Sequence, residues 1–328
     1  MKKFLALMMA FAMSLSLVAC GGGDKSGDAS KTEEGGTIGV CIYKFDDAFM
    51  TTYRNALQEI LEDKGYKVTV VDGNNDQAKQ NEQINTFITQ GVDALIINPV
   101  MTSAAATIVD TVKAADIPTV LINREPTADD MAAYNKLVYV GCDAAQSGTF
   151  QGQLILDTEN KGDINGDGVV SYIMIQGDPE NIDAQYRTEF SIKALTDAGK
   201  TVECLDSQVG NWDQTKGQEL CANALTVHGY DVEVVFCNND GIAMGALTAI
   251  QTAGRIVGED IYLVGVDALP EAVEAIKLGD MTGTVLNDHI GQSHAAVDVA
   301  VKVLNGEAID NYYWVNYVKV DKAYAEAQ

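Results

Sequence analysis

The chain has few of the residues that catalysis and nucleic-acid binding require. It contains three histidines, and no GxSxG, P-loop or strand-linked GxGxxG signature is present, so no enzymatic role is indicated. Lysine and arginine number 22 against 47 acidic residues, which gives a formal net charge of −25. A surface of this charge disfavours nucleic acid and anionic lipid and favours solubility.

Cysteine is sparse and lacks metal-binding spacing. No CxxC or Cys/His zinc pattern occurs, and an odd number of cysteines follows Cys20, which excludes a complete disulfide framework for that part of the chain. We expect Cys41 and Cys237, which lie in apolar strand-like runs, to be buried small hydrophobes. A Cys204–Cys221 disulfide remains an open alternative. The later cysteines are Cys41, Cys142, Cys204, Cys221 and Cys237.

An apolar segment follows two lysines at the start of the chain and ends in Leu-Val-Ala-Cys at Cys20. It is shorter than a membrane span and predicts a secretory signal peptide over residues 1–19. The ending resembles the bacterial lipobox, so we expect an extracytoplasmic protein that is lipid-anchored to the cell membrane through Cys20. A plain signal peptide with a coincidental cysteine is the alternative. Residues 20–36 then form the lipidated cysteine and a flexible tether of Gly, Ser and charged residues.

From residue 37 onward, apolar runs alternate with helical patterns. This alternation predicts parallel sheets covered on both faces. The predicted strands are 37–43, 67–72, 94–98, 119–123 and 137–141 in the first half, 169–176, 201–206, 232–238, 261–266 and 282–286 in the second, and 312–320 near the end. The predicted fold class is α/β, with two doubly wound parallel-sheet lobes joined by a three-crossing hinge. The first lobe is predicted to comprise 37–141 plus 288–314, and the second 142–287 plus 315–328.

Nearly every predicted strand is followed by Asp or Asn. Ligands of open α/β sheets collect at the carboxyl ends of the strands, so these side chains are expected to meet in one cleft. Helix capping is the alternative role for each of them taken singly. Carboxylates and amides bind hydroxyl groups well, and aromatic rings such as Phe49 and Trp212 pack on the C–H faces of a sugar. The pattern therefore favours a neutral polyol ligand.

Motifs spread along the chain carry a resemblance. IGVCIYKFDDAFM (38–50), NDQAKQNEQI (75–84), REP (124–126), NND (238–240), GVDALPEA (265–272) and GTVLND (283–288) occur in this order. Together they resemble the galactose/glucose-binding proteins of bacterial ABC transporters, over nearly all of residues 37–328. The resemblance implies the periplasmic binding protein type I fold and a hexose ligand.

The resemblance also implies a set of sugar contacts. Phe49 and Trp212 would sandwich the pyranose, and the polar members would bind its hydroxyls. Asn181 departs from the family pattern, because a histidine is common at that position, and this departure puts sugar preference and affinity in doubt. The implied contacts are Asp47, Phe49, Asn98, Asn181, Asp183, Arg187, Trp212, Asn239, Asp267 and Asn287.

Residues 163–171 (DINGDGVVS) resemble an EF-hand loop, which alternates oxygen ligands and turns at a glycine. The twelfth position should carry a bidentate glutamate, but Met174 stands there. The galactose/glucose-binding family has the same truncated loop and borrows a remote glutamate, which matches Glu233 here, while Ser171 replaces a longer glutamine. A turn without metal is the alternative. The implied Ca²⁺ ligands are Asp163, Asn165, Asp167, Val169 (backbone), Ser171 and Glu233.

The expected function is extracytoplasmic binding of D-galactose or D-glucose by a monomer that delivers the sugar to an ABC permease. The two lobes would close around the ligand by hinge motion at 141–143, 286–289 and 314–317. A chemoreceptor or sensor kinase is a second expected partner. A binding protein for ribose or xylose, or a sugar-sensing accessory protein, is the alternative. The signal peptide stands where a related transcription regulator would carry its DNA-binding helices, which excludes that class.

Overall fold

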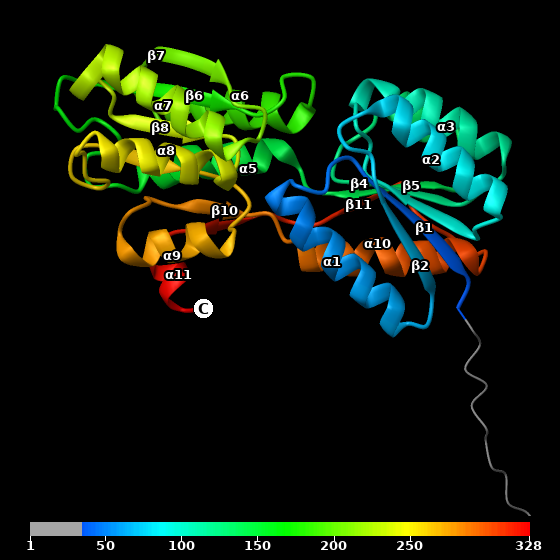
Figure 1. The fold of residues 1–328 in the computed structure, drawn as a ribbon. Coiled ribbons are helices and arrows are strands. Elements are labelled where there is room, and N and C mark those ends of the chain that lie inside the picture. Colours follow the sequence, from blue (N-terminus) through cyan, green and yellow to red (C-terminus); the bar gives the residue numbers. More distant parts are fainter. Residues whose placement is uncertain (1–34) are drawn as a thin grey trace, which may run out of the picture. The chain divides into compact units, whose positions relative to one another are not determined.

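Six parallel strands form the sheet of the first lobe, in the order β11-β5-β4-β3-β1-β2 (Figure 1). Their bounds are β1 (Thr37–Ile42), β2 (Lys67–Asp72), β3 (Ala94–Ile97), β4 (Thr119–Ile122), β5 (Leu137–Gly141) and β11 (Tyr312–Trp314). The central strands β3, β4 and β5 are buried along their whole length. Continuous apolar strands of this kind are stable only where helices cover both faces of the sheet.

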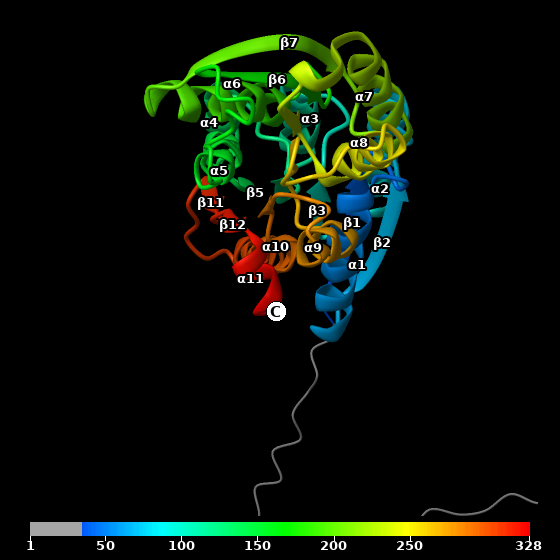
Figure 2. The ribbon, with the colours of Figure 1, turned by 90° about the vertical axis from the view of Figure 1, so that its left-hand side faces the viewer.

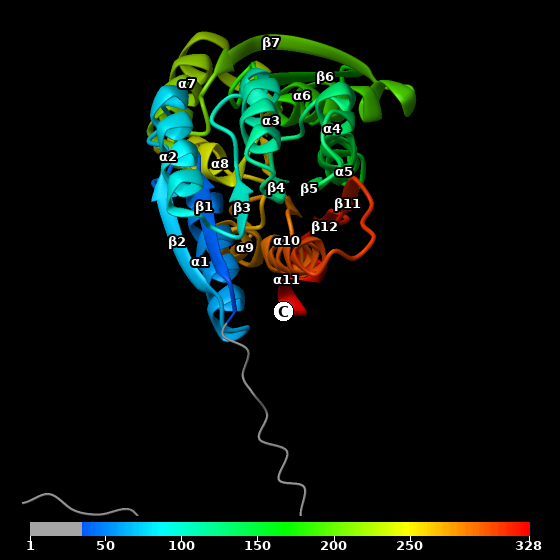
Figure 3. The same ribbon diagram turned by 90° about the vertical axis from the view of Figure 1, so that its right-hand side faces the viewer.

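Helices cover both faces of this sheet. On one face α1 (Ala48–Asp63) packs against α10 (His289–Leu304), and their apolar residues share one core with β1, β3, β4 and β5. The other face carries α2 (Gln77–Gln90), α3 (Ala105–Ala114), the short α4 (Ala128–Ala132) and a 3-10 turn, η1 (Thr102–Ala104). Figures 1 and 3 show these two layers on either side of the strands.

The second lobe has a four-stranded parallel sheet in the order β7-β6-β8-β9. Its strands are β6 (Val169–Gln176), β7 (Thr201–Val209), β8 (Val234–Cys237) and β9 (Tyr262–Val264). The helices are α5 (Ala144–Leu156) and α6 (Ile182–Asp197) on one face, and α7 (Gln214–His228), α8 (Asp240–Thr252) and α9 (Pro270–Leu278) on the other, with η2 (Gly229–Asp231) after α7. Figure 2 shows β7 along the outer edge of this sheet.

The structure is a computed structural model that describes residues 35–328. The predicted signal peptide, Cys20 and nearly all of the predicted tether lie outside the described residues. No helix within residues 35–328 is long and apolar enough to cross a membrane. The five cysteines of this range are free thiols, so the structure shows no Cys204–Cys221 disulfide.

The chain passes between the lobes three times, after β5, after β10 (Thr284–Leu286) and after β11. The predicted strand 312–320 is wrong as a single element. β11 joins the first sheet beside β5, whereas β12 (Val318–Val320) pairs antiparallel with β10 in the second lobe, before α11 (Lys322–Glu326). Val315 donates its N–H to the Gly141 carbonyl at 2.9 Å, and Tyr317 N–H bonds Gln146 Oε1 at 2.8 Å. The chain therefore passes from the first lobe to the second at residues 315–317, in the middle of a run that looks continuous in the sequence.

The fold class is confirmed: two doubly wound parallel-sheet lobes are joined by three crossings. We call 35–141 plus 288–314 the first lobe and 142–287 plus 315–328 the second lobe. Most predicted strands agree with the structure to within one or two residues, while β7 extends to Val209 and β8, β9 and β10 are shorter than predicted.

Candidate functional site

A pocket with about 350 Å³ of empty space lies between the two lobes. Its lining combines carboxylates, amides and two guanidinium groups with aromatic rings. The lining residues are Tyr43, Asp47, Phe49, Met50, Asn123 and Arg124 from the first lobe, Asn181, Asp183, Arg187, Trp212, Asn239 and Asp267 from the second, and Asn287 at the second crossing.

Three of the polar residues stand at helix N-termini and cap them. Asp47 Oδ1 accepts the N–H of Met50 at 2.8 Å, and Asn239 Oδ1 accepts that of Ile242 at 2.9 Å. Asn181 caps α6 in the same way. Capping and pocket lining therefore occur together, because each cap lies at the carboxyl edge of a sheet, where the following helix begins.

Asp183 and Arg187 lie one helical turn apart on α6, and both are buried. Two Arg187 nitrogens are bonded, Nη1 to the Asn238 carbonyl at 2.8 Å and Nη2 to Tyr317 Oη at 3.0 Å. Its Nε is buried without a hydrogen-bond partner among residues 35–328. Burial raises the pKa of the Asp183 carboxyl, although Arg187 and Arg124 act to lower it. The pair thus presents a free donor beside a desolvated carboxylate.

Asp267 and Asn287 form the floor near the second crossing. Asn287 Nδ2 donates to Asp267 Oδ1 at 3.2 Å, and Gln292 Nε2 donates to Asn287 Oδ1 at 2.7 Å. Burial raises the pKa of Asp267 well above its usual range. Asp267 has a φ of 125°, a backbone conformation that non-glycine residues rarely adopt and that is concentrated at functional sites.

The two aromatic rings that were predicted to sandwich the sugar come from opposite lobes. Phe49 is 6% exposed and makes edge contacts with Tyr53 and His289. Trp212 has a φ of 65°, and its ring lies so close to Gly177 that a Cβ there would approach the ring to 2.2 Å. Glycine at 177 is thus required for the indole to reach its position.

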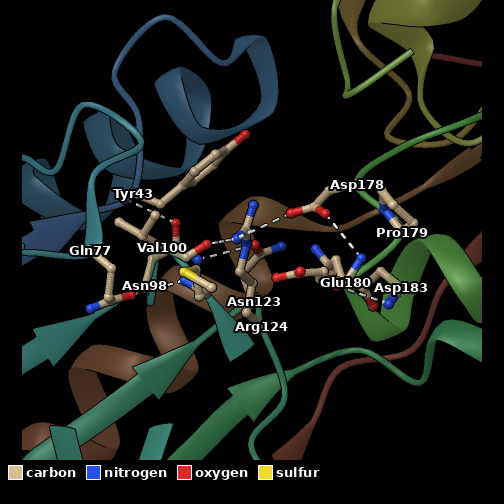
Figure 4. Close-up of polar contacts among 12 residues, drawn as sticks. Tyr43, Gln77, Asn98, Val100, Asn123, Arg124, Asp178, Pro179, Glu180 and Asp183 are labelled. Atoms are coloured by element: carbon tan, nitrogen blue, oxygen red, sulfur yellow. Dashed lines mark hydrogen bonds and ion pairs between the residues drawn. The ribbon is translucent and has the colours of Figure 1, made fainter. Parts of the chain in front are cut away.

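The structure places Asn98 beneath the pocket and not in its lining. Asn98 is fully buried and donates through Nδ2 to Asn123 Oδ1 at 3.2 Å, while its own Oδ1 accepts the N–H of Tyr43 at 3.3 Å (Figure 4). Asn123, with a φ of 64°, lines the pocket in its place. Asn123 is one of the Asp and Asn residues at strand ends that were expected to meet in one cleft, although it was not among the implied sugar contacts. The other nine predicted sugar contacts all lie in the lining.

Three further lining residues were not predicted: Tyr43, Met50 and Arg124. Arg124 belongs to the REP motif and is 2% exposed. The signal that could have identified it is its position next to Asn123, directly after β4.

The loop 163–171 has the turns of an EF-hand-like segment. Asp163 accepts the N–H groups of Gly166 and Gly168 at 2.9 and 3.1 Å, and Asp167 Oδ1 accepts that of Val169 at 2.8 Å. Within the described residues, no group of three or more acidic, histidine or cysteine side chains is arranged to hold a metal ion.

Glu233, the predicted remote ligand, is 1% exposed and already bonded to the loop backbone. Its Oε1 accepts the N–H groups of Ile164 at 2.6 Å and Asn165 at 2.9 Å, and Oε2 accepts that of Ser171 at 2.9 Å. The donor set is all oxygen, which is the chemistry that Ca²⁺ prefers. The glutamate, however, would have to give up backbone bonds to become a bidentate ligand.

Comparisons with known proteins agree with this fold. A family model described as a periplasmic binding protein domain matches residues 38–308. The D-galactose/methyl-galactoside binding periplasmic protein MglB of Haemophilus influenzae is 36% identical over 299 residues, covering 87% of this chain and 89% of that protein. The ribose import binding protein RbsB of Salmonella typhimurium is 30% identical, covering 98% of this chain and 99% of that protein. A solved ABC transporter solute binding protein from Bacillus halodurans with bound myo-inositol matches at a TM-score of 0.78 and 29% identity, covering 90% of this chain and 98% of that one.

Two parallel-sheet lobes with a polar pocket between them are the architecture of a solute-binding protein. The chain belongs to the periplasmic binding protein family. It is a substrate-binding protein and not an enzyme, as predicted. Proteins of this family act outside the cytoplasm, in agreement with the predicted extracytoplasmic location.

Proposed function

We propose that this protein binds a hexose of the galactose/glucose type in the pocket between its lobes and delivers it to an ABC permease. The observation that carries the proposal is the set of desolvated polar groups around a space of about 350 Å³. A buried polar group without a partner is costly, and in this lining the Nε of Arg187 is such a group, to which a sugar hydroxyl supplies the missing acceptor.

The individual groups support a neutral polyol. The Asp183 and Asp267 carboxylates accept bonds from hydroxyl groups, and the unpaired Nε of Arg187 donates one. The aromatic faces of Phe49 and Trp212, from opposite lobes, suit the C–H faces of a pyranose. The 36% identity with a galactose-binding protein, higher than the 30% with a ribose-binding one, favours a hexose.

A pentose or a cyclitol is the second candidate. The ribose relative covers 98% of this chain, and the solved relative at 29% identity holds myo-inositol. All three ligand types present hydroxyl groups on a small ring, so the polar lining alone favours none of them.

A ligand panel measured by calorimetry tests the proposal. Galactose, glucose, ribose, xylose and myo-inositol are titrated into the protein and into Asp267→Asn. We expect the tightest binding with galactose or glucose and a loss of about 10- to 100-fold in the variant, because one acceptor oxygen facing the sugar hydroxyls is replaced by a donor. Tightest binding of ribose or inositol would replace hexose as the ligand, and no binding of any panel member would reject a sugar-binding function.

We also propose a lipid anchor at Cys20, which would keep the protein beside a membrane partner, because two acyl chains hold a protein at a bilayer more firmly than one. We expect Cys20→Ala to move the protein from the membrane fraction to the medium. Retention in the membrane fraction would reject the anchor. A chemoreceptor or sensor kinase as second partner, and a monomeric state, stay predictions.

Calcium binding by the loop 163–171 also stays a prediction. If Ca²⁺ binds, Asp163, Asn165, Asp167, Ser171, Glu233 and the Val169 carbonyl would hold it, and the ion would stabilise the second lobe. Calorimetric titration with Ca²⁺ and melting in a chelator test it. If titration with Ca²⁺ gives no heat of binding and a chelator does not lower the melting temperature, the site is excluded.

A further inference from the structure

One ion pair joins the two lobes directly. Arg124 Nη1 of the first lobe lies 3.9 Å from Asp178 Oδ2 of the second (Figure 4). Every other ion pair among residues 35–328 connects residues of the same lobe. Neither residue belongs to the three crossings, so the contact depends on how closely the two lobes approach each other.

The first lobe holds Arg124 in place without help from a ligand. Its Nη1 donates to the carbonyl of Val100, and its guanidinium carbon lies 4.2 Å from the centre of the Tyr43 ring, over its face. A stacked and bonded guanidinium loses little further side-chain entropy when a carboxylate approaches it.

The second lobe holds Asp178 in place as well. Its Oδ1 accepts the N–H of Glu180 at 3.0 Å, and its backbone carbonyl accepts the N–H of Asn181 at 3.0 Å. This turn leaves Oδ2 facing Arg124. The Asp178 side chain is 32% exposed and is absent from the lining of the sugar pocket.

Asp178 lines a second, larger opening that adjoins the sugar pocket. This opening shares Tyr43, Arg124 and Trp212 with the sugar pocket, and Asp213 lies in its wall. Asp213 resembles Asp178 in its local role, because its Oδ1 accepts the N–H of Lys216 at 2.8 Å at the start of α7. No ion pair of Asp213 is present among residues 35–328, which makes it a matched control.

We propose that Asp178 is an affinity-determining residue that never touches the ligand and acts by holding the cleft closed through Arg124. Ligand binding and lobe closure are coupled, so any contact made only in the closed form slows the release of the ligand. The inference rests on the proposed function for its ligand, but it concerns closure and not the choice of sugar.

The test compares Asp178→Asn with Asp213→Asn. Each asparagine keeps the oxygen that its turn or cap needs, and each removes one negative charge from the same opening. We expect Asp178→Asn to weaken binding of the tightest sugar in the panel by about two- to fivefold, the range of a partly exposed ion pair. The change should appear in the dissociation rate by stopped-flow fluorescence, and it should shrink in 1 M salt. Asp213→Asn should leave the rate unchanged.

Equal dissociation rates for Asp178→Asn and the unmodified protein would overturn the proposal, as would an equal effect of Asp213→Asn. Asp178→Glu, which restores the charge, should recover at least half of the loss, and its failure to do so would count against an ionic contact. If no sugar binds, the proposed function fails separately. Small-angle scattering of the unliganded proteins then decides the closure role: Asp178→Asn should have the larger radius of gyration, and an unchanged radius would reject it.

Discussion

Glu233 is expected to stabilise the second lobe through its backbone bonds, whether or not calcium binds. The carboxylate is buried and accepts three N–H groups, from Ile164, Asn165 and Ser171, which are more than 60 residues away in the chain. Glu233→Gln keeps the shape but replaces one acceptor oxygen by a donor. At least one of the three N–H groups then loses its partner.

The magnitude follows from those contacts. A buried N–H without an acceptor costs about 1–3 kcal/mol, and bonds to a charged acceptor are stronger than neutral ones. We therefore expect Glu233→Gln to lower the free energy of unfolding by about 2–4 kcal/mol. At about 2–3 °C per kcal/mol for a protein of this size, the melting temperature should fall by about 4–12 °C.

The assay is thermal unfolding by circular dichroism in EDTA and in excess Ca²⁺. The expected drop appears in EDTA, because the backbone bonds need no metal. If Glu233 served only as a metal ligand, the variant and the unmodified protein would have the same melting temperature in EDTA and would differ only in Ca²⁺. That result would refute the reasoning. Glu203→Gln is the control: Glu203 is exposed on β7, directly beside Ser171 of β6, and should change the melting temperature by less than about 1 °C.

Two further predictions concern the pocket and its surroundings. Gly177→Ala should displace the Trp212 ring, since a Cβ would lie 2.2 Å from it. Calorimetry should then show sugar affinity reduced by about tenfold or more while the fold is retained. Unchanged affinity would contradict the role of Gly177. Burial raises the pKa of Asp240 to about 7, although Thr284 and the Leu269 N–H donate to it. The folded state then holds a proton that the unfolded chain releases, so this contribution to stability is present below about pH 4 and is lost as the pH rises through about 7. The melting temperature of Asp240→Asn minus that of the unmodified protein should therefore increase from pH 5 to pH 8, and a constant difference would argue against the raised pKa.

The strands and helices of both lobes follow from local pattern. Runs such as ALII and TVLI predict buried parallel strands, and Asp76 and Asp143 cap the helices that follow other strands. These features depend on neighbouring residues, so a single sequence is enough to place them within a residue or two. The types of most pocket residues are equally local, because caps and strand ends are where Asp and Asn gather.

Long-range contacts determine which strand-end residues line the pocket and to which lobe the last strands belong. Asn98 and Asn123 both follow apolar strands, but only Asn123 has the left-handed backbone that places it in the pocket, while Asn98 supports it from below. The run 312–320 is one apolar pattern, and only the positions of β5 and β10 determine that it divides between the two lobes.

The sequence by itself determined the class of this protein: its two rounds of strand and helix, and the polar residue types at their edges. Only the tertiary structure decided which charges meet. Arg124 and Asp178 are 54 positions apart and belong to different lobes, and Glu233 reaches its three N–H donors across more than 60 positions. Local pattern sets how each segment folds because its causes are sterics and hydrophobic periodicity between near neighbours. Contacts between residues far apart in the sequence depend on the positions of all the segments that lie between them, and a local pattern does not contain this information.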